Sequence, residues 1–370
     1  MSKSARVYVR PVGLAESPQT FDGATIRLGH SLVWCHLVAL ESYEGARLVG
    51  RQIVPVDRFA DALNALPTDQ AERALAQFAN LSRAHPPLQL GERVLRFDQP
   101  QVMGILNVTP DSFSDGGRFT DDPAQAADAG FAMLTAGASL IDIGGESTRP
   151  DAPVVWEGDE IARVVPAIQA LVQSGAILSV DTRKAAVMEA ALAAGAHIVN
   201  DVSALLYDSR ALDVVLRSGC PVVLMHAPSQ GANPHAGGGY GHVVTDVFDW
   251  LEARVAAVIA AGVAREKVIV DPGIGFGKSL ADNLALINAL PLFHALGQPI
   301  LFGASRKRMI GALSNEAPVD ARLGGSIALA MSAIGSGAQI VRVHDVPETV
   351  QAARVWRGLR DAALTVPGLD

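Results

Sequence analysis

The chain has 370 residues, 49% of them hydrophobic and 18% charged, which is enough apolar surface for a large folded core. The formal net charge of −8 at pH 7 disfavours nucleic acid and anionic membranes as partners, although a local basic pocket can still bind a phosphate. Two cysteines outside any CxxC or Cys/His cluster argue against a zinc site or a disulfide scaffold, and the lack of a long apolar window predicts a cytoplasmic protein.

Residues 1–98 differ in pattern from the rest of the chain and are expected to form a small α/β appendage. Strands are predicted at 7–12, 24–28, 31–41 and 47–56, which are separated by glycine, proline and serine breaks. A helix is predicted from about Asp69 to Ala84, with Thr68 or Asp69 as its N-cap and Pro86-Pro87 after its end. Residues 1–98 contain no cluster of acids, bases and cations like the one predicted after Gln99. A chain that begins near Gln99 is therefore expected to keep a complete pocket.

From Gln99 onward, apolar runs alternate regularly with Ala-rich segments of helical periodicity. The eight runs are VMGILNVT, SLIDIGG, ILSVDT, HIVNDVS, PVVLMHA, VIVDPG, PILFGAS and QIVRVHD. Continuous Val, Ile and Leu are typical of strands that are buried on both faces, as in a parallel sheet covered by helices. The count and the length predict a (β/α)8 or TIM barrel over residues 99–370. A doubly wound open sheet is the alternative, but its usual Gly-x-Gly-x-x-Gly turn after the first strand is missing.

Nearly every predicted barrel strand ends in polar residues, and the chemistry of such barrels collects at these ends. The strand-end residues are Asn107, Asp142, Glu146, Asp181, Asn200, Asp201, His226, Asp271, Ser305, Lys307, Arg342 and His344. Acids and amides can pair with the edge of a flat, nitrogen-rich heterocycle, which suits Asp181, Asn200 and Asp271. Arg149, Arg342 and His344 would supply positive charge for an anion, and the Asn107 carbonyl oxygen is a plausible ligand of Mg²⁺.

Each of these residues also has an ordinary structural explanation. Asp181 and Asp271 could be helix N-caps, and Asn200-Asp201 could form a turn. His226 is more often a core histidine than a catalyst, and the run 306–308 would ordinarily be a solvated face. His235 and His242 lie among glycine and proline and are expected to be incidental. The ordinary explanations are less convincing as a set than one by one, because all of them would have to apply at the same end of one barrel.

Long motifs in this region resemble those of the dihydropteroate synthase family. MGILNVTPDSFSDGG begins at Met103, IDIGGESTRP at Ile141, DPGIGFGK at Asp271, GASRK at Gly303 and RVHDV at Arg342, in the family's order. The resemblance covers about Gln99 to Leu359. It implies condensation of 6-hydroxymethyl-7,8-dihydropterin diphosphate with p-aminobenzoate to 7,8-dihydropteroate and diphosphate, with Mg²⁺ as cofactor. The sequence departs from the family pattern in two places. Asp151 stands where the family commonly has glycine, and the residues after Met225-His226 differ from those of the family.

The resemblance also implies roles for individual residues. The pterin would be held by Asp181, Asn200, Asp271 and Lys307, with Met225 among the substrate-binding residues. Asn107 would coordinate Mg²⁺ on the diphosphate. Diphosphate would be bound by Thr148, Arg149, Arg342 and His344, and the p-aminobenzoate site would be lined by Phe113, Pro150 and Ser305. Arg149, Lys307, Arg342 and His344 would form the catalytic set, and a homodimer is expected.

Two other functions compete with this interpretation. A pterin-binding barrel that passes a methyl group from a folate to a corrinoid would share the pterin aspartates, but would need neither the SRK-type arylamine pocket nor the RVHDV anion site. A non-catalytic pterin-binding paralogue would be expected to lose loop residues, yet the sequence contains Asn107, Arg149, Lys307, Arg342 and His344. Both observations favour the synthase.

Overall fold

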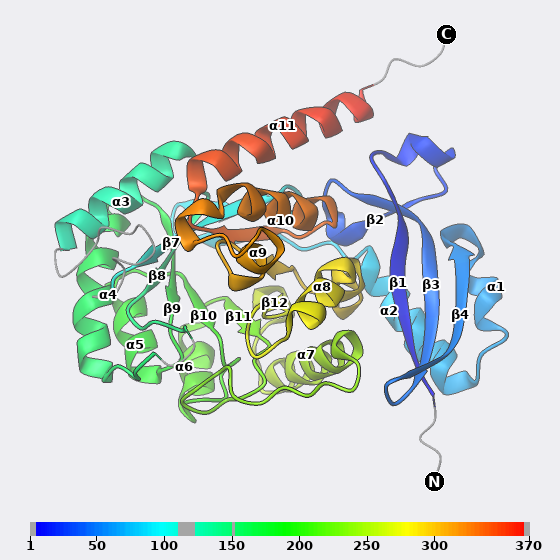
Figure 1. The fold of residues 1–370 in the computed structure, drawn as a ribbon, viewed down its shortest axis with the longest axis horizontal. Helices are drawn as coiled ribbons and strands as arrows, with labels where there is room; N and C mark the ends of the chain where they lie inside the picture. Colours follow the sequence, from blue (N-terminus) through cyan, green and yellow to red (C-terminus); the bar gives the residue numbers. More distant parts are fainter. Residues whose placement is uncertain (1–4, 110–122, 150–151, 366–370) are drawn as a thin grey trace.

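The computed structural model describes residues 5–109, 123–149 and 152–365, and its larger part is a ring of eight parallel strands (Figure 1). The strands are β7 (Gln101–Asn107), β8 (Leu140–Gly144), β9 (Ile177–Asp181), β10 (Ile198–Asp201), β11 (Val222–Met225), β12 (Val268–Asp271), β13 (Leu301–Phe302) and β14 (Ile340–Val343). Their order is β12-β11-β10-β9-β8-β7-β14-β13. A parallel bridge between Val270 and Ile300 joins the two ends. The predicted (β/α)8 barrel is confirmed, with a strand in each of the eight apolar runs.

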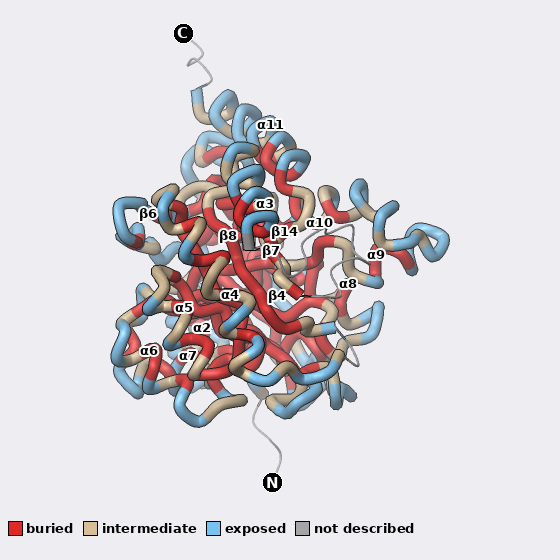
Figure 2. The backbone as a smooth tube through the Cα atoms, turned by 90° about the vertical axis from the view of Figure 1, so that its left-hand side faces the viewer, coloured by how far each residue is buried: buried red, intermediate tan, exposed pale blue. Residues whose placement is uncertain are grey.

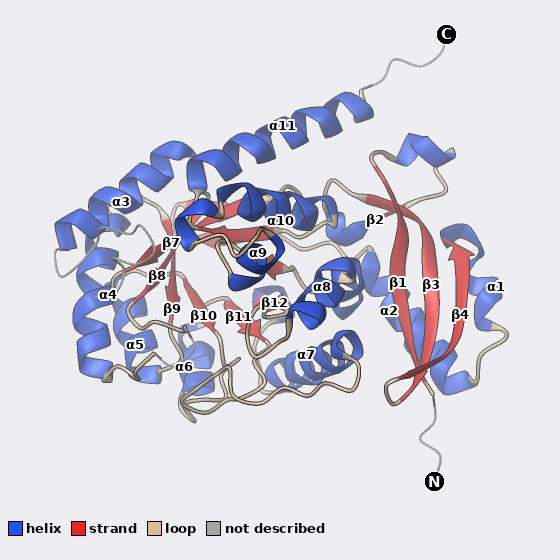
Figure 3. Cartoon of the chain, viewed as in Figure 1, coloured by secondary structure: helices blue, strands red, loops and turns tan. Residues whose placement is uncertain are grey.

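Helices surround this ring and cover the outer faces of its strands (Figure 3). They are α3 (Pro123–Ala136), α4 (Glu157–Val172), α5 (Ala185–Ala194), α6 (Ala211–Ser218), α7 (Val243–Ala260), α8 (Leu280–Asn288), α9 (Arg308–Leu313), α10 (Leu323–Gly335) and α11 (Val346–Leu364). In Figure 2, β7, β8 and β14 lie among buried backbone, whereas the far end of α11 is exposed. None of the helices in the described ranges combines the length and the apolar composition needed to cross a membrane.

Side chains alternate along each barrel strand between the helices and the interior of the ring, because successive residues of a strand point to opposite faces. Outward residues such as Ile141, Val180 and Val341 join the large core beneath the helices. Inward residues at the amino ends of the strands form a separate apolar layer. It consists of Met103, Leu140, Ile177, Ile198, Val223, Ile269, Leu301 and Ile340. Two residues further along, the inward positions include Asp142, Asn200, Asp271 and Arg342. The interior is therefore apolar at one end and polar at the other.

The N-terminal appendage contains an antiparallel sheet and two helices. The elements are β1 (Arg6–Ala15), β2 (Ile26–Arg27), β3 (Trp34–Glu44), β4 (Arg47–Pro55), α1 (Phe59–Leu63) and α2 (Thr68–Leu81). All four predicted strands and the helix are present. The predicted N-cap is wrong, however, because α2 follows Pro67 and no side chain caps it. The helix also ends at Leu81, before the two prolines.

The appendage packs against the side of the barrel that carries α7 and α8 (Figure 1). Both β1 and α2 contact the short 3-10 helix Leu290–Leu296, and their buried residues belong to the same apolar core as the barrel helices. Polar contacts frame this core: the Tyr8 hydroxyl lies 2.9 Å from Asp249 Oδ2, and Asn80 Nδ2 donates to Ala295 O at 2.9 Å. The appendage and the barrel thus share one continuous hydrophobic core.

A short hairpin that the sequence did not predict closes the apolar end of the barrel. It consists of β5 (Leu88–Leu90) and β6 (Arg93–Leu95), which pair antiparallel. Leu88, Leu90, Leu95 and Phe97 pack against the apolar layer inside the strands. The boundary expected at Gln99 remains a prediction, and the hairpin just before it packs inside the barrel.

The hairpin leads to a stability prediction with an internal control. Leu95 is 1% exposed and its neighbour Val94 is 50% exposed. Leu95→Ala should lower the free energy of unfolding by about 3 kcal/mol, because it leaves a cavity between the hairpin and the strands. Val94→Ala should change it by no more than about 0.5 kcal/mol. Urea denaturation measures both, and equal effects would show that the hairpin does not seal the barrel.

Candidate active site

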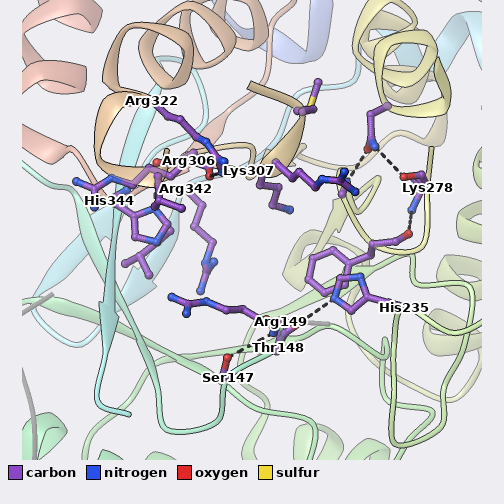
Figure 4. A pocket seen from close by; sticks show the side chains of 18 of the residues that line it. Ser147, Thr148, Arg149, His235, Lys278, Arg306, Lys307, Arg322, Arg342 and His344 are labelled. Atoms are coloured by element: carbon purple, nitrogen blue, oxygen red, sulfur yellow. Dashed lines mark hydrogen bonds between the residues drawn. The ribbon is translucent and has the colours of Figure 1, made fainter. Parts of the chain in front are cut away.

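A cavity of about 1010 Å³ opens at the carboxyl ends of the barrel strands, and cationic side chains dominate its wall (Figure 4). These cations are Arg149, Lys278, Arg306, Lys307, Arg308, Arg322 and Arg342. The described part of the wall contains two carboxylates, Glu146 and Asp181. A chain with a net charge of −8 therefore has a locally positive pocket, which is suited to an anionic ligand.

Arg342 of β14 joins three strands at the floor of the cavity. Its Nε donates to Asp142 Oδ2 at 2.6 Å and its Nη2 donates to Asp181 Oδ2 at 2.7 Å. Asn200 Nδ2 donates to the same Asp142 oxygen at 2.8 Å. An arginine has five N–H donors, so these two bonds leave others for a ligand.

Burial and the nearby guanidinium have opposite effects on the pKa of a carboxylate in this network. Asp142 is fully buried, and its Oδ1 has no hydrogen-bond partner among the described residues. Burial raises the pKa of Asp181, and the guanidinium of Arg342 opposes that rise. The 2.7 Å contact with Arg342 favours the charged carboxylate of Asp181, so Asp181 and Arg342 form an ion pair.

Asp271 ends β12, and the loop that follows it folds back beneath Lys307. Asp271 Oδ1 accepts from Gly273 N at 2.7 Å. Gly273 has a φ of 68°, and a Cβ there would lie 1.9 Å from His226 O, so this close turn requires glycine. Lys307 Nζ donates to Ile274 O and lies 4.7 Å from the centre of the Phe276 ring.

Two partly buried lysines hold this loop. Burial lowers the pKa of Lys307 to about 8, and Asp271 opposes the shift. Burial and the neighbouring Lys307 lower the pKa of Lys278 to about 7. Lys278 Nζ donates to Gly273 O at 2.8 Å and lies 3.1 Å from His226 Nδ1. His226 is thus a satisfied core histidine, and Lys278 cross-links the loop.

His344 follows the end of β14 and is hydrogen-bonded to Ser305. Its Nδ1 lies 3.0 Å from Ser305 Oγ, which also accepts from the His344 backbone N–H at 3.2 Å. Burial, followed by the charge of Arg342, lowers the pKa of His344 to about 3. A low pKa favours the neutral imidazole, so the positive charge expected from His344 stays a prediction.

The loop after β8 is fixed by a buried carboxylate. Glu146 Oε1 accepts from Val155 N at 3.1 Å, and Glu146 Oε2 lies 3.1 Å from Lys184 Nζ. Lys184 also binds the fully buried Glu160 at 2.6 Å. These contacts fix both ends of the segment that carries Thr148 and Arg149.

The fit of a magnesium ion depends on one amide oxygen. Asn107 ends β7 and lines the cavity, as predicted. The described residues contain no group of three or more His, Cys, Asp or Glu side chains that could hold a metal by themselves. Mg²⁺ commonly takes one or two protein ligands and keeps its waters and substrate phosphates, so Asn107 fits an ion that arrives with a diphosphate.

The structure gathers most of the predicted site residues in one place. Those that line the cavity are Asn107, Thr148, Arg149, Asp181, Ser305, Lys307, Arg342 and His344. Asn200, Asp271 and Met225 are buried beside it. Met225 packs with Phe276, which itself lines the cavity. Phe113, Pro150 and Asp151 lie outside the described residues.

Several ordinary explanations of these residues are ruled out. Asp181 and Asp271 are not helix N-caps, because Lys184 precedes α5 and Ser279 caps α8. The solvated-face explanation holds for the exposed Arg308. Arg306 and Lys307 are half-buried, however, and Arg306 pairs with Asp345. The turn explanation holds for Asp201, whose carboxylate accepts from Ser203 N and Leu205 N, but not for Asn200.

Three residues have structural roles that their sequence context does not indicate. The sequence indicates only that Asp142 ends a strand, whereas in the structure its carboxylate accepts from both Arg342 and Asn200. The expectation that His235 and His242 are incidental is wrong, because His235 lines the cavity and His242 caps α7. The two-residue alternation along β8 could have indicated Asp142, whereas no local pattern marks His235.

Comparisons with known proteins agree with the geometry. A family model described as pterin binding enzyme matches residues 103–344. The dihydropteroate synthase of Escherichia coli K12 is 44% identical over 264 residues, which cover 70% of this chain and 92% of that protein. A Xanthomonas albilineans dihydropteroate synthase solved with 4-aminobenzoic acid is 45% identical, with a TM-score of 0.70, and the match covers 77% of this chain and all of that one. The same enzyme solved with 7,8-dihydropteroate is 44% identical over 76% of this chain and all of that one, with a TM-score of 0.67.

The carboxylate beneath Arg342 gives a second stability prediction. Asp142→Asn should lower the free energy of unfolding by about 3 kcal/mol, because Arg342 and Asn200 lose a buried anionic acceptor. Asp159→Asn, at an exposed aspartate on α4, should change it by no more than about 0.5 kcal/mol. Denaturant titration of the two variants compares them directly. A stable Asp142→Asn variant would mean that Asp181 alone neutralises Arg342.

Proposed function

The chain belongs to the dihydropteroate synthases of the pterin-binding enzyme family, and on this basis we propose how its own residues carry out the condensation. The reaction joins a pterin methyl diphosphate to p-aminobenzoate and releases diphosphate. The observation that carries the proposal is the meeting of a buried acid and amide floor with a cationic wall in one cavity. A flat heterocycle needs the first, and a diphosphate needs the second.

Recognition of the pterin is assigned to the floor. Asp271 would accept two N–H bonds from the edge that bears N3 and the 2-amino group, a geometry that a carboxylate suits well. Asn200 and Asp181 would bind other polar atoms of the ring, and Lys307 would lie along it. Asp181, Asn200 and Asp271 are buried, and each carboxylate can accept further N–H bonds beyond those made within the protein, which supports this role.

Departure of the diphosphate is assigned to the wall. The C–O bond at the exocyclic methylene breaks, its electron pair leaves with the diphosphate, and a C–N bond forms to the arylamine. Arg149 and Arg342 would neutralise the growing negative charge, with hydrogen bonds from Thr148 and His344. Mg²⁺ bound by Asn107 and the diphosphate would supply further charge neutralisation.

The arylamine needs little activation. A neutral aromatic amine is already nucleophilic, and the electron-rich pterin can stabilise positive charge on the methylene, which favours a dissociative path. A strong general base is then not required. Ser305, together with Phe113 and Pro150, would line the p-aminobenzoate site.

The expected homodimer and cytoplasmic location stay predictions.

The decisive assay combines the purified protein with pterin diphosphate, p-aminobenzoate and Mg²⁺. Chromatography should show dihydropteroate and diphosphate in equal amounts. Omitting either substrate should abolish the product. Release of diphosphate without dihydropteroate would contradict the proposed arylamine transfer.

The pterin assignment predicts the behaviour of one isosteric variant. Asp271→Asn should lower kcat/KM by at least about a hundredfold, because a donor replaces one of the two acceptors that face the pterin edge. The fold should survive, which circular dichroism checks. Calorimetry with pterin alone completes the test, and unchanged pterin affinity would show that Asp271 has another role.

The low pKa of Lys307 predicts a pH dependence of binding. Below pH 8 the lysine is charged, and an anionic ligand favours that form, so above pH 8 binding must take up a proton. The affinity for pterin diphosphate should therefore fall above pH 8, by up to about tenfold per pH unit. Lys307→Arg keeps its charge and should flatten this profile. An unchanged profile in that variant would assign the titration to another group.

A further inference from the structure

The loop between β11 and α7 reaches across the cavity mouth through His235 (Figure 4). The Nε2 atom of His235 lies 2.7 Å from Thr148 O, in the loop after β8. Gly277 N, in the loop after β12, donates to Nδ1 at 3.4 Å. The imidazole also stacks on Phe276, with ring centres 4.8 Å apart and an angle of 11° between the planes. One side chain therefore joins three loops.

These contacts select one form of the imidazole. Because Gly277 N–H points at Nδ1, that nitrogen accepts, so Nε2 carries the proton and donates to the Thr148 carbonyl. A second proton would have to sit on Nδ1 and would displace the Gly277 bond. Burial lowers the pKa of His235, which also favours the neutral ring.

The loop that presents His235 is itself held in place. Arg183 Nη1 donates to Gly231 O and to Ala232 O, each at 2.9 Å. Arg183 is 6% exposed, its guanidinium lies 4.2 Å from the centre of the Tyr207 ring, and its Nη2 lies 3.4 Å from Glu146 Oε1. The buried arginine thus ties the loop to the same carboxylate that anchors the β8 loop.

We propose that His235 is a positioning residue, which fixes the Thr148 backbone and thereby sets Arg149 over the departing diphosphate. The inference rests on the proposed function, in which Arg149 meets that anion. Glu146 fixes the segment on one side and His235 fixes it two residues later. Without the second contact, more of the ordering of the Thr148 backbone would have to come from ligand binding, and this would reduce the affinity.

The first test compares two ligands that differ only in the diphosphate. Calorimetry should show that His235→Ala binds pterin diphosphate about tenfold more weakly, while its affinity for the pterin alcohol stays within about twofold. His235→Gln keeps an N–H donor and an acceptor and should recover most of the loss. Gln230→Ala removes a bond to Ala227 O within the same loop and should behave like the parent. Equal losses for both ligands would mean that His235 supports the pterin loop, and would overturn the proposal.

A double-mutant cycle tests whether His235 acts through Arg149. If His235 acts through Arg149, Arg149→Ala combined with His235→Ala should bind pterin diphosphate no more weakly than Arg149→Ala alone. Additive losses, or an Arg149→Ala variant that binds like the parent, would overturn the proposal. The parent protein's turnover is measured first, so a failed synthase assay is distinguished from a failed role for His235.

Discussion

Closure of eight short parallel strands into a ring is the constraint on which the rest of this structure depends. In a closed ring, every second residue must face inward, so the strand register decides which side chains share the interior. Met103 and Ile340 lie in the apolar layer, and Arg342 lies two residues beyond Ile340 at the polar end. A slip of one residue would turn these charges into the core beneath the helices.

The polar end is stable because each of its charged side chains lies near one of opposite charge. Arg342 lies between Asp142 and Asp181, and Lys307 lies in the field of Asp271. Burying such groups is costly unless each has a partner. Their placement beside a cationic wall leaves a site that is almost neutral at its floor and positive at its rim. Such a gradient suits a ligand with a neutral heterocycle and a charged tail.

The two ends of the barrel are completed by different parts of the chain. At the apolar end, the hairpin formed by β5 and β6 seals the interior with leucine and phenylalanine. At the polar end, the loops after the strands form the wall of the cavity. The appendage contacts the end of the loop between β11 and α7, where the rings of Tyr43 and His242 lie 4.7 Å apart. The N-terminal region therefore contacts both the barrel body and the base of the loop that carries His235.

Local patterns in the sequence determined the barrel, the four appendage strands and the inward polar positions at Asp181, Asn200, Asp271 and Arg342, because strand periodicity and strand ends are short-range signals. The motifs also identified the family. Tertiary structure alone decided which of these groups are partners. The residues in the Arg342 contacts are separated by 200 and 161 positions, and those in the His235–Thr148 contact by 87. Ring closure and loop packing create such pairs, and no pattern within a single segment encodes the distance between two strands or loops.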